Sequence, residues 1–355
     1  MDYVYKFLVV KGFQAERDYY IAMVPLKMLS KLFPADEEYV SPEYRAQRKI
    51  NEARIPVITK YILDNRDSYV FSALAASIDG TFKYIPDPQN STVGVLEVSM
   101  DAKFLINDGQ HRKAAIIEAL KEDDSLGDET ISMVFFADKG LERSQQIFTD
   151  LNKNAVKTSN SISELYDSRD QIAVITRNVI KRIDFLNTYT DKEKDILGKF
   201  SSSLFTLNTF YTANKVITGN KIDDSTEIFL YEYWSSVTKH MSLWNDLAHK
   251  EITKKDLREK YIATQGIVIQ ALGRIGAYFY QHPEIDMQAA LEKLESINWS
   301  RDAEQWIMRA INHNGRIITN KRAATLIGNV IKNVIGLSFT ADEAFAEDQL
   351  QKSIH

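Results

Sequence analysis

Five consecutive residues, Asp108-Gly109-Gln110-His111-Arg112, combine side chains that bind anions with a glycine that allows close backbone approach. The apolar run Phe104-Leu105-Ile106 precedes them, and a helical pattern follows from His111 to Lys121. A strand that ends in glycine and leads directly into a helix directs several backbone N–H groups to one place. The positive end of the helix dipole also lies there. The segment therefore predicts a phosphate-binding or nucleotide-binding corner.

Four of these residues have roles that such a pocket needs. Arg112 can bind a phosphate through two hydrogen bonds from its guanidinium group, and Gly109 lets the backbone approach the ligand. Asp108 can hold a divalent metal ion or a sugar hydroxyl, and His111 can hydrogen-bond a phosphate or move a proton near neutral pH. In the alternative interpretation Asp108 caps the helix, Gly109 serves the turn, and His111 and Arg112 are exposed first-turn residues. The residues alone leave both interpretations open.

The elements that must position this corner belong to a mixed N-terminal domain, which we expect over residues 1–160. Its apolar alternation predicts strands near residues 3–13, 18–24, 69–78, 93–98, 103–107 and 130–136. Helices are expected at residues 25–32, from Pro42 onward with an interruption or kink at Pro56, and at residues 111–121 and 141–151. Residues 161–355 have helical periodicity with no convincing strand. The predicted fold class is therefore α+β, a mixed domain followed by a mainly helical one.

Length and composition are those of a globular protein. The chain has 355 residues, of which 44% are hydrophobic and 26% charged, and this length suggests two domains. No apolar run approaches the ~18 residues that a membrane-spanning helix needs. The start Met1-Asp2-Tyr3 lacks the basic region of a signal peptide. We therefore expect a cytoplasmic protein with no membrane partner.

The absence of cysteine excludes several kinds of chemistry for this chain. Disulfides, thiolate-held iron–sulfur clusters, cysteine-type zinc sites and thiol nucleophiles all require that residue. The 6 histidines are scattered, and no two have the i, i+4 spacing of a helical zinc pair.

A second candidate surface lies near residues 299–336. A helix over residues 299–312, a turn at His313-Asn314-Gly315 and a helix from Lys321 that Asn320 caps predict a hairpin similar to a helix–turn–helix. Three basic residues stand where a recognition helix presents its reading groups: Arg316, Lys321 and Arg322. An ordinary pair of helices that packs into the core is the alternative.

Two further segments carry candidate ligands. Arg48, Asn51 and Arg54 have i, i+3, i+6 spacing, so they either line the cleft, contact DNA phosphates or form a solvated helix face. Asn152, Asn154 and Lys157 surround a predicted helix end. Amides suit ribose, base or phosphate contacts and lysines suit phosphates, whereas an asparagine can also simply end a helix.

The order of these segments resembles a known family. Asp108–Arg112 resembles the signature of the DGQHR family, and three other segments resemble its DndB branch, from bacterial DNA phosphorothioation (sulfur-modification) systems. They are Lys11-Gly12-Phe13-Gln14 with Arg17, residues 47–54, and residues 148–157. The resemblance is strong over about residues 1–160 and diffuse beyond. The family is more remotely similar to the ParB/sulfiredoxin fold, in which a glycine-then-arginine turn binds a nucleoside triphosphate. Gln110 stands where sulfiredoxins have their catalytic cysteine, which excludes thiol chemistry here.

The resemblance implies a regulatory protein that represses transcription of the modification operon. Its expected partners are double-stranded DNA at its own operon promoter, other proteins of the system and a further copy of the chain. It implies ATP or another nucleoside triphosphate with Mg²⁺, and a triphosphatase activity that the sequence leaves open. The residues implied as ligands are Gly109, Gln110, Arg112, Asn152, Asn154 and Lys157. Those implied in hydrolysis are Asp108, which would also hold the metal, His111 and Arg112.

Two alternative functions stay open. In the first, the protein is a DNA-binding repressor with no nucleotide chemistry, and the five-residue segment only builds the fold or touches a DNA phosphate. In the second it is a DNA-nicking enzyme that uses Asp108 and His111, although the sequence shows no clear cluster of carboxylates for it. The DNA-binding residues expected in either case are Arg48, Arg54, Arg316, Lys321 and Arg322.

Overall fold

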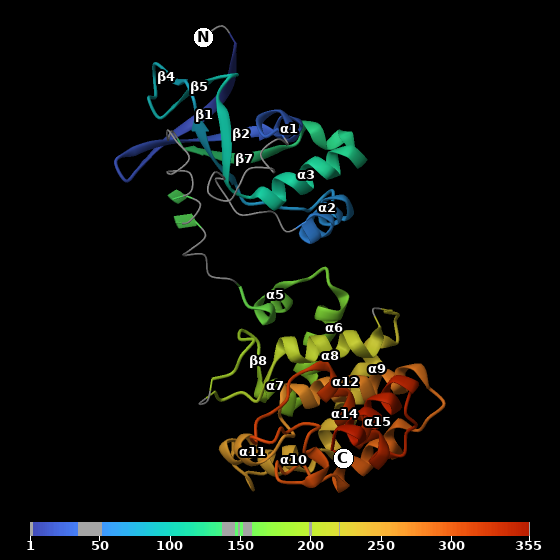
Figure 1. Cartoon of the computed structure of the whole chain (residues 1–355). Helices are drawn as coiled ribbons and strands as arrows, with labels where there is room; N and C mark the ends of the chain where they lie inside the picture. The colour runs from blue at the N-terminus through green and yellow to red at the C-terminus, as the bar shows by residue number, and fades with distance from the viewer. Residues whose placement is uncertain are drawn as a thin grey trace. The chain divides into compact units, whose positions relative to one another are not determined.

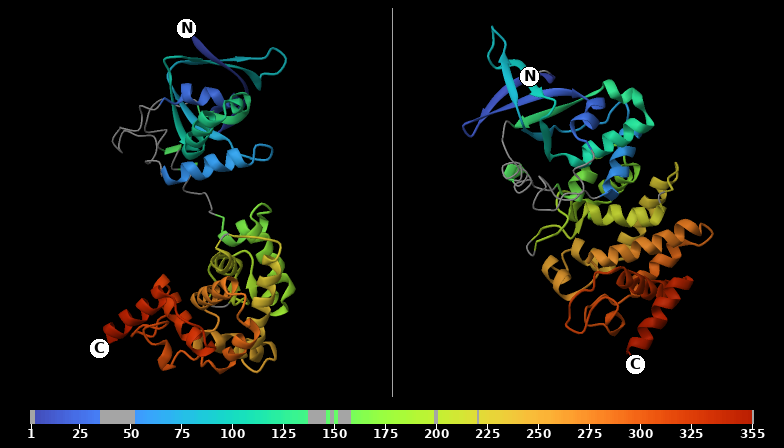
Figure 2. Two further views of the ribbon diagram at one scale, coloured as in Figure 1. Left: turned by 90° about the vertical axis from the view of Figure 1, so that its right-hand side faces the viewer. Right: turned by 45° about the horizontal axis from the view of Figure 1, so that its top comes forward.

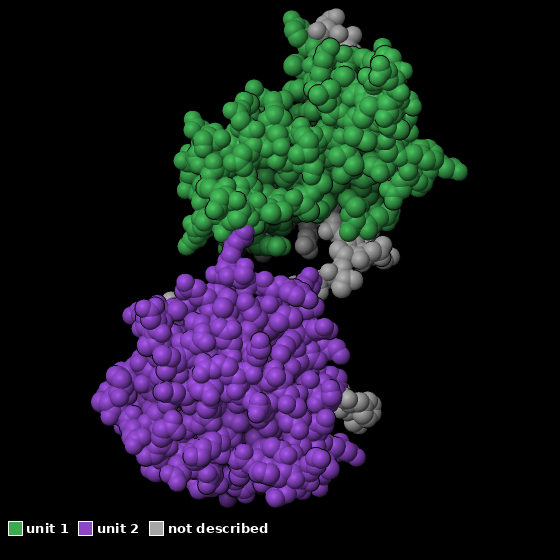
Figure 3. All heavy atoms as spheres, turned by 180° about the vertical axis from the view of Figure 1, so that it is seen from behind, with its two compact units in different colours: residues 1–156 green, residues 157–355 purple. Residues whose placement is uncertain are grey.

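The computed structural model describes residues 3–34, 52–136, 146–147, 150–151, 158–198, 201–219 and 221–354 (Figure 1). The chain divides into two compact units, Met1–Val156 and Lys157–His355, which Figure 3 shows in separate colours. The first unit contains a mixed sheet, and the second is built almost entirely of helices (Figure 2). A mixed unit is therefore followed by a mainly helical one, as the α+β prediction requires. The ParB-like layout stays a prediction.

The sheet of the first unit has seven strands in the order β4-β5-β1-β2-β7-β3-β6. Their bounds are β1 Val4–Gln14, β2 Arg17–Pro25, β3 Leu74–Asp79, β4 Phe82–Pro86, β5 Val93–Ser99, β6 Lys103–Asp108 and β7 Thr130–Phe136. The pair β3–β7 is parallel, and the other neighbours are antiparallel. Because β6 lies at the edge of the sheet next to β3, the corner after Asp108 lies beside the start of β3.

The hairpin β1–β2 confirms the predicted first pair of strands. Gln14 pairs with Arg17 across a two-residue loop. Ala15 and Glu16 both have positive φ, 50° and 61°, which is the geometry of a type I′ turn. Alternate residues such as Phe7 and Val9 are buried, as the period of two in the sequence predicts.

Three helical segments pack in the first unit. They are Leu26–Leu32 (a 3₁₀ turn followed by α1, Leu29–Leu32), α2 Ile55–Asp64 and α3 Gln110–Glu122. Helix α3 contacts both of the others and buries Ala115, Ile116 and Ala119 in the core. Pro56 stands in the first turn of α2, where its missing N–H costs nothing. It therefore begins this helix, and the predicted segment before residue 52 lies outside the described residues.

The predicted strand near residues 69–78 is wrong in its first half. β3 begins only at Leu74. The carbonyl groups of Ser72 and Ala73 instead accept hydrogen bonds from the Arg112 side chain. A side chain thus takes the place of a neighbouring strand at these two residues. The edge strand β4 was not predicted, since its sequence ends in the Pro86–Asn90 turn.

The described part of the second unit is a bundle of helices with one short two-stranded parallel sheet and isolated bridges. The α-helices are α5 Asn160–Tyr166, α6 Gln171–Arg182, α7 Asp184–Tyr189, α8 Leu207–Thr218, α9 Thr226–His240, α10 Ser242–Ala248, α11 Lys254–Lys260, α12 Gly266–Gln281, α13 Met287–Glu292, α14 Lys321–Ile335 and α15 Ala341–Ile354; β8 is Thr190–Asp191 and β9 Phe205–Thr206. Helices α8 and α12 cross closely, because a Cβ at Gly273 would lie 3.0 Å from Ala213 Cα. None of the helices in the described residues is long and apolar enough to cross a membrane.

The helix predicted over residues 299–312 is absent, so the helix–turn–helix-like hairpin is wrong in its first half. This segment contains only a 3₁₀ turn at Glu304–Trp306 and isolated bridges. The buried rings of Trp299 and Trp306 stack at 5.4 Å, and the Trp306 indole N–H donates to the Asn298 carbonyl at 2.7 Å. Met308 has a φ of 60°, which no helix accepts. The second half is confirmed, since Asn320 caps α14 through the Ala323 N–H.

Candidate anion-binding corner

Gly109 makes the junction between β6 and α3 in a left-handed conformation, with φ 94° and ψ 17°. A Cβ at this position would lie 2.3 Å from Leu74 Cδ2. Both the backbone angle and the contact therefore require glycine. The N-cap of α3 is Gly109, which has no side chain, and the Asp108 carboxylate pairs with Arg112, so the interpretation in which Asp108 caps this helix is wrong. The start of a helix, with its positive dipole end, is suited to an anion.

The side chain of Arg112 donates hydrogen bonds to the residues around this corner. Its Nη2 donates to Asp108 Oδ2 at 2.7 Å, and its Nη1 donates to the carbonyls of Ser72 at 2.6 Å and Ala73 at 3.0 Å. The hydroxyl of Ser72 is a further acceptor for Nη1. Only 18% of the Arg112 side chain is exposed, so the interpretation of Arg112 as an exposed first-turn residue is wrong. The guanidinium places a positive charge at the corner. Most of its terminal N–H groups, however, already donate hydrogen bonds to other atoms of the protein.

Gln110 lies under the corner and is almost completely buried. Within the described residues, its Oε1 has no hydrogen-bond partner. Amide oxygen and nitrogen exchange places by a simple flip, so this side chain can offer either an acceptor or a donor. A buried polar atom without a partner costs free energy that a bound ligand would recover.

A buried polar pair, which the sequence did not single out, supports the same corner. Ser77 Oγ in β3 donates to Asn107 Oδ1 in β6 at 3.0 Å, and neither residue is exposed. The only signal in the sequence is an asparagine next to Asp108 within an otherwise apolar strand. The pair ties β3 to β6 and so fixes where α3 begins.

The donor groups of the corner fit a phosphate better than a metal ion held by protein alone. Asp108 is already paired with Arg112, and His111 is half-buried with an interaction of its own. Among the described residues, no three histidine, aspartate or glutamate side chains gather around a common point. A Mg²⁺ ion at this corner would therefore depend on ligand phosphates in addition to Asp108.

The other predicted ligands of the corner are only partly described. Arg48, Asn152, Asn154 and Lys157 lie outside the described residues, so their place at the corner stays a prediction. Arg54 is exposed and directly precedes α2. Helix α2 contacts α3 through a hydrogen bond from Thr59 Oγ1 to the Ala115 carbonyl at 3.3 Å. Arg54 thus begins a helix that packs on the helix of the corner.

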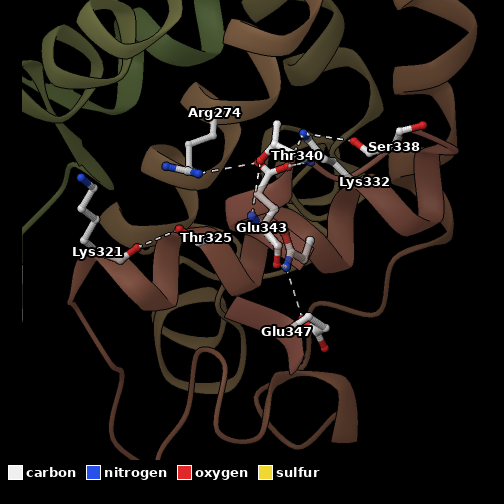
Figure 4. Close-up of polar contacts among 9 residues, drawn as sticks. Arg274, Lys321, Thr325, Lys332, Ser338, Thr340, Glu343 and Glu347 are labelled. Atoms are coloured by element: carbon white, nitrogen blue, oxygen red, sulfur yellow. Dashed lines mark hydrogen bonds and ion pairs between the residues drawn. The ribbon is translucent and has the colours of Figure 1, made fainter. Parts of the chain in front are cut away.

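The three basic residues near the start of α14 are exposed: Arg316, Lys321 and Arg322. In the part of the chain that the structure describes, no carboxylate pairs with any of them. Farther along, α14 is anchored by the buried ion pair between Lys332 Nζ and Glu343 Oε2 at 2.7 Å, and Lys321 lies at the opposite end of the helix (Figure 4). Most residues of α14 after its first turn are buried. Its start can contact DNA phosphates, but the helix has no free face to enter a groove as a recognition helix does.

Comparison with known proteins gives one match. A family model described as DndB, DNA-sulfur modification-associated, matches residues 7–338. The match extends through the helical unit as far as the loop before α15. Neither a curated protein nor a solved structure matches the chain.

Proposed function

The chain belongs to the DndB family, which is associated with DNA sulfur modification, and from this premise we propose that it regulates a bacterial DNA phosphorothioate modification system. It binds the promoter of the modification operon as a repressor, and it binds a nucleoside triphosphate at the corner around Gly109. The chain has no cysteine, so a thiolate for sulfur transfer has to come from another protein. A regulatory role is consistent with this composition.

The observation that carries the nucleotide half is the start of α3. It combines a helix N-terminus whose N-cap, Gly109, has a backbone angle and a close contact that require glycine with the buried Oε1 of Gln110, which has no partner among the described residues. In the proposed complex the N–H groups after Gly109 hold phosphate oxygens, and Arg112 neutralises part of their charge. Asp108 positions Mg²⁺ or a water molecule, and His111 orients that water. Hydrolysis at such a site is slow and acts as a switch.

The DNA half is supported by the exposed cations at the start of α14, Arg316, Lys321 and Arg322, together with Arg54. Their positions suit contacts with the phosphate backbone, which supply affinity and register on DNA.

Thermal unfolding with and without ATP, GTP or CTP, each with Mg²⁺, tests the nucleotide half. At least one nucleotide should raise the melting temperature of the wild-type protein, because a ligand that binds only the folded state stabilises it. Gln110→Leu, which removes the amide with the unpartnered oxygen, should lose most of that rise. Lys121→Gln, at the other end of α3, should keep it. If no nucleotide changes the melting temperature of the wild-type protein, the nucleotide half of the proposal is wrong. The remaining function is then that of a repressor without nucleotide chemistry.

Fluorescence anisotropy with a duplex of the operon promoter, over a series of salt concentrations, tests the DNA half. The triple variant Arg316→Gln, Lys321→Gln, Arg322→Gln should bind more weakly. The slope of log K against log salt should fall by about 0.9 for each DNA phosphate that the variant no longer neutralises. The matched control replaces three exposed lysines elsewhere in the helical unit: Lys181, Lys239 and Lys250. Equal weakening in both triple variants would assign the effect to net charge and refute these contacts.

A further inference from the structure

The helical unit contains a cavity of about 910 Å³. It is lined by residues 195–198, Ser201, Leu204 and the adjoining β9, by residues of α11 and by the start of α12. Three other cavities have volumes of only about 330–340 Å³. Small-molecule sites usually have volumes of roughly 300–1,000 Å³. The large cavity can therefore enclose a ligand of nucleotide size.

One wall of this cavity is apolar and rigid. Leu204 and Phe205 are buried and line it. The Phe205 ring packs edge-on against Phe210 and Trp244, with centroid distances of 5.3 and 5.1 Å. A side chain held on two sides by aromatic rings has a fixed position. Since Leu204 and Phe205 are only 5% and 2% exposed, they form a fixed apolar backing of the cavity, and Ile196, which also lines it and is 86% exposed, adds accessible apolar surface.

The opposite side carries polar groups that lack partners. Thr264 is only 6% exposed and lines the cavity. Its hydroxyl has no hydrogen-bond partner among the residues that the structure describes. Gln265 precedes α12 without capping it, and Gly266 begins that helix with its backbone exposed to the cavity. A ligand that brings hydrogen-bonding groups here could bond to the Thr264 hydroxyl and to the start of a 16-residue helix.

The rim of the cavity adds positive charge from α11. Lys254 Nζ donates to the Ser202 carbonyl at 3.2 Å, and Arg258 donates to the Ser203 carbonyl. These bonds fix the segment that contains Ser202 and Ser203, next to Leu204. Because the acceptors are neutral carbonyl groups, the positive charges of Lys254 and Arg258 are not neutralised. Lys255 is exposed at the same rim.

Two carboxylates also line the cavity, Asp195 and Glu259. Asp195 accepts hydrogen bonds from the backbone N–H groups of Asn160 and Ser161, both at 2.8 Å. Its carboxylate therefore binds the start of α5. Glu259 is exposed. The lining therefore holds three cations against two carboxylates, and this small excess of positive charge favours a ligand with negative charge.

From these groups we infer that the cavity binds a nucleoside phosphate. The base lies against the apolar lining at Ile196, which Leu204 and Phe205 back, and the phosphate lies toward Lys255 and the start of α12. Thr319 lines the same cavity two residues before Lys321, so the ligand also touches the segment that leads into α14. This site is distinct from the corner at Gly109 and gives the helical unit an effector of its own, beyond the proposed function.

Isothermal titration of the full-length chain tests this inference, with ATP, GTP and CTP as ligands and with adenosine and inorganic phosphate as partial ligands. At least one nucleotide should bind, and adenosine and phosphate should each bind at least about tenfold more weakly, because each lacks half of the contacts. Lys255→Gln and Thr264→Val should each weaken nucleotide binding by about tenfold, the effect of removing one charged or buried hydrogen bond. The control Lys181→Gln, an exposed lysine on α6, should bind as the wild-type protein does.

The same titrations separate this site from the corner. If Lys255→Gln and Thr264→Val weaken binding while Gln110→Leu does not, the nucleotide occupies the cavity. If only Gln110→Leu weakens binding, the corner is the nucleotide site and the inference is wrong. Absence of binding by all three nucleotides would overturn it as well. Two independent binding events, each sensitive to its own variants, would support both sites.

Discussion

Arg112 Nη2 lies 2.7 Å from Asp108 Oδ2, four residues earlier and across the junction between β6 and α3. The other terminal nitrogen of the same guanidinium holds the backbone of Ser72 and Ala73. One side chain therefore connects the end of β6, the start of α3 and the segment before β3. The arginine that the sequence predicts as a phosphate ligand is also a structural tie, so its removal affects stability as well as binding.

Arg112→Ala should lower the free energy of unfolding by about 1.5–3 kcal/mol, since hydrogen bonds that involve a charged group contribute that much. Urea denaturation measures the change. Lys121→Gln, in the last turn of α3, is the control and should stay within about 0.5 kcal/mol of the wild-type value. If the Arg112→Ala protein is as stable as this control, the hydrogen bonds of Arg112 contribute nothing to the free energy of unfolding.

Gly109→Ala should destabilise the protein by at least about 1–3 kcal/mol, because alanine at a φ of 94° is strained and its Cβ would meet the Leu74 side chain. Gly127→Ala is the matched substitution. Gly127 has no positive φ, and a Cβ there would make only ordinary contacts with Lys27, the nearest at 3.4 Å. Thermal unfolding of the two variants should therefore differ clearly, and equal melting temperatures would contradict the corner geometry.

The ion pair between Lys332 and Glu343 is nearly inaccessible to solvent and joins α14 to α15 (Figure 4). Glu343→Gln and Lys332→Met should each cost about 3–5 kcal/mol, because each leaves a buried charge without its counterpart. The double variant should cost less than the sum of the two, as a double-mutant cycle from urea denaturation would report. Additive costs would mean that the two charges do not interact.

Glu164 makes stability depend on pH. Burial, followed by the negative charges of Asp195 and Asp170, raises the pKa of the Glu164 carboxyl from 4.5 to about 7. Between these two values the folded protein holds a proton that the unfolded chain has released. The free energy of unfolding should therefore fall as pH rises across this window and level off above it.

Glu164→Gln should remove that dependence, because the amide does not ionise. Its stability relative to the wild-type protein should increase from pH 5 to pH 8, as measured by urea denaturation at each pH. The exposed Glu232→Gln on α9 is the control and should follow the wild-type curve. A Glu164→Gln curve parallel to the wild-type curve would refute the raised pKa.

Local patterns were enough to predict much of the fold. The alternation of Phe7 and Val9, the run Thr130–Phe136 and the glycine before α3 each depend on interactions between near neighbours in sequence, and the structure contains the elements they predict. The same holds for Asn320, whose cap on α14 involves a residue three positions away. Such features need only the geometry of one strand, turn or helix end.

Features that depend on distant residues were decided only by the tertiary structure. Ser72 and Ala73 are kept out of the sheet because Arg112, some forty residues later, binds their carbonyls. Residues 299–312 have a helical pattern, yet the stacking of Trp299 on Trp306 favours a compact loop. The cavity beside Thr264 is formed by segments about sixty residues apart. Sequence periodicity reports the burial of one element at a time, whereas these contacts arise only when separate elements pack together.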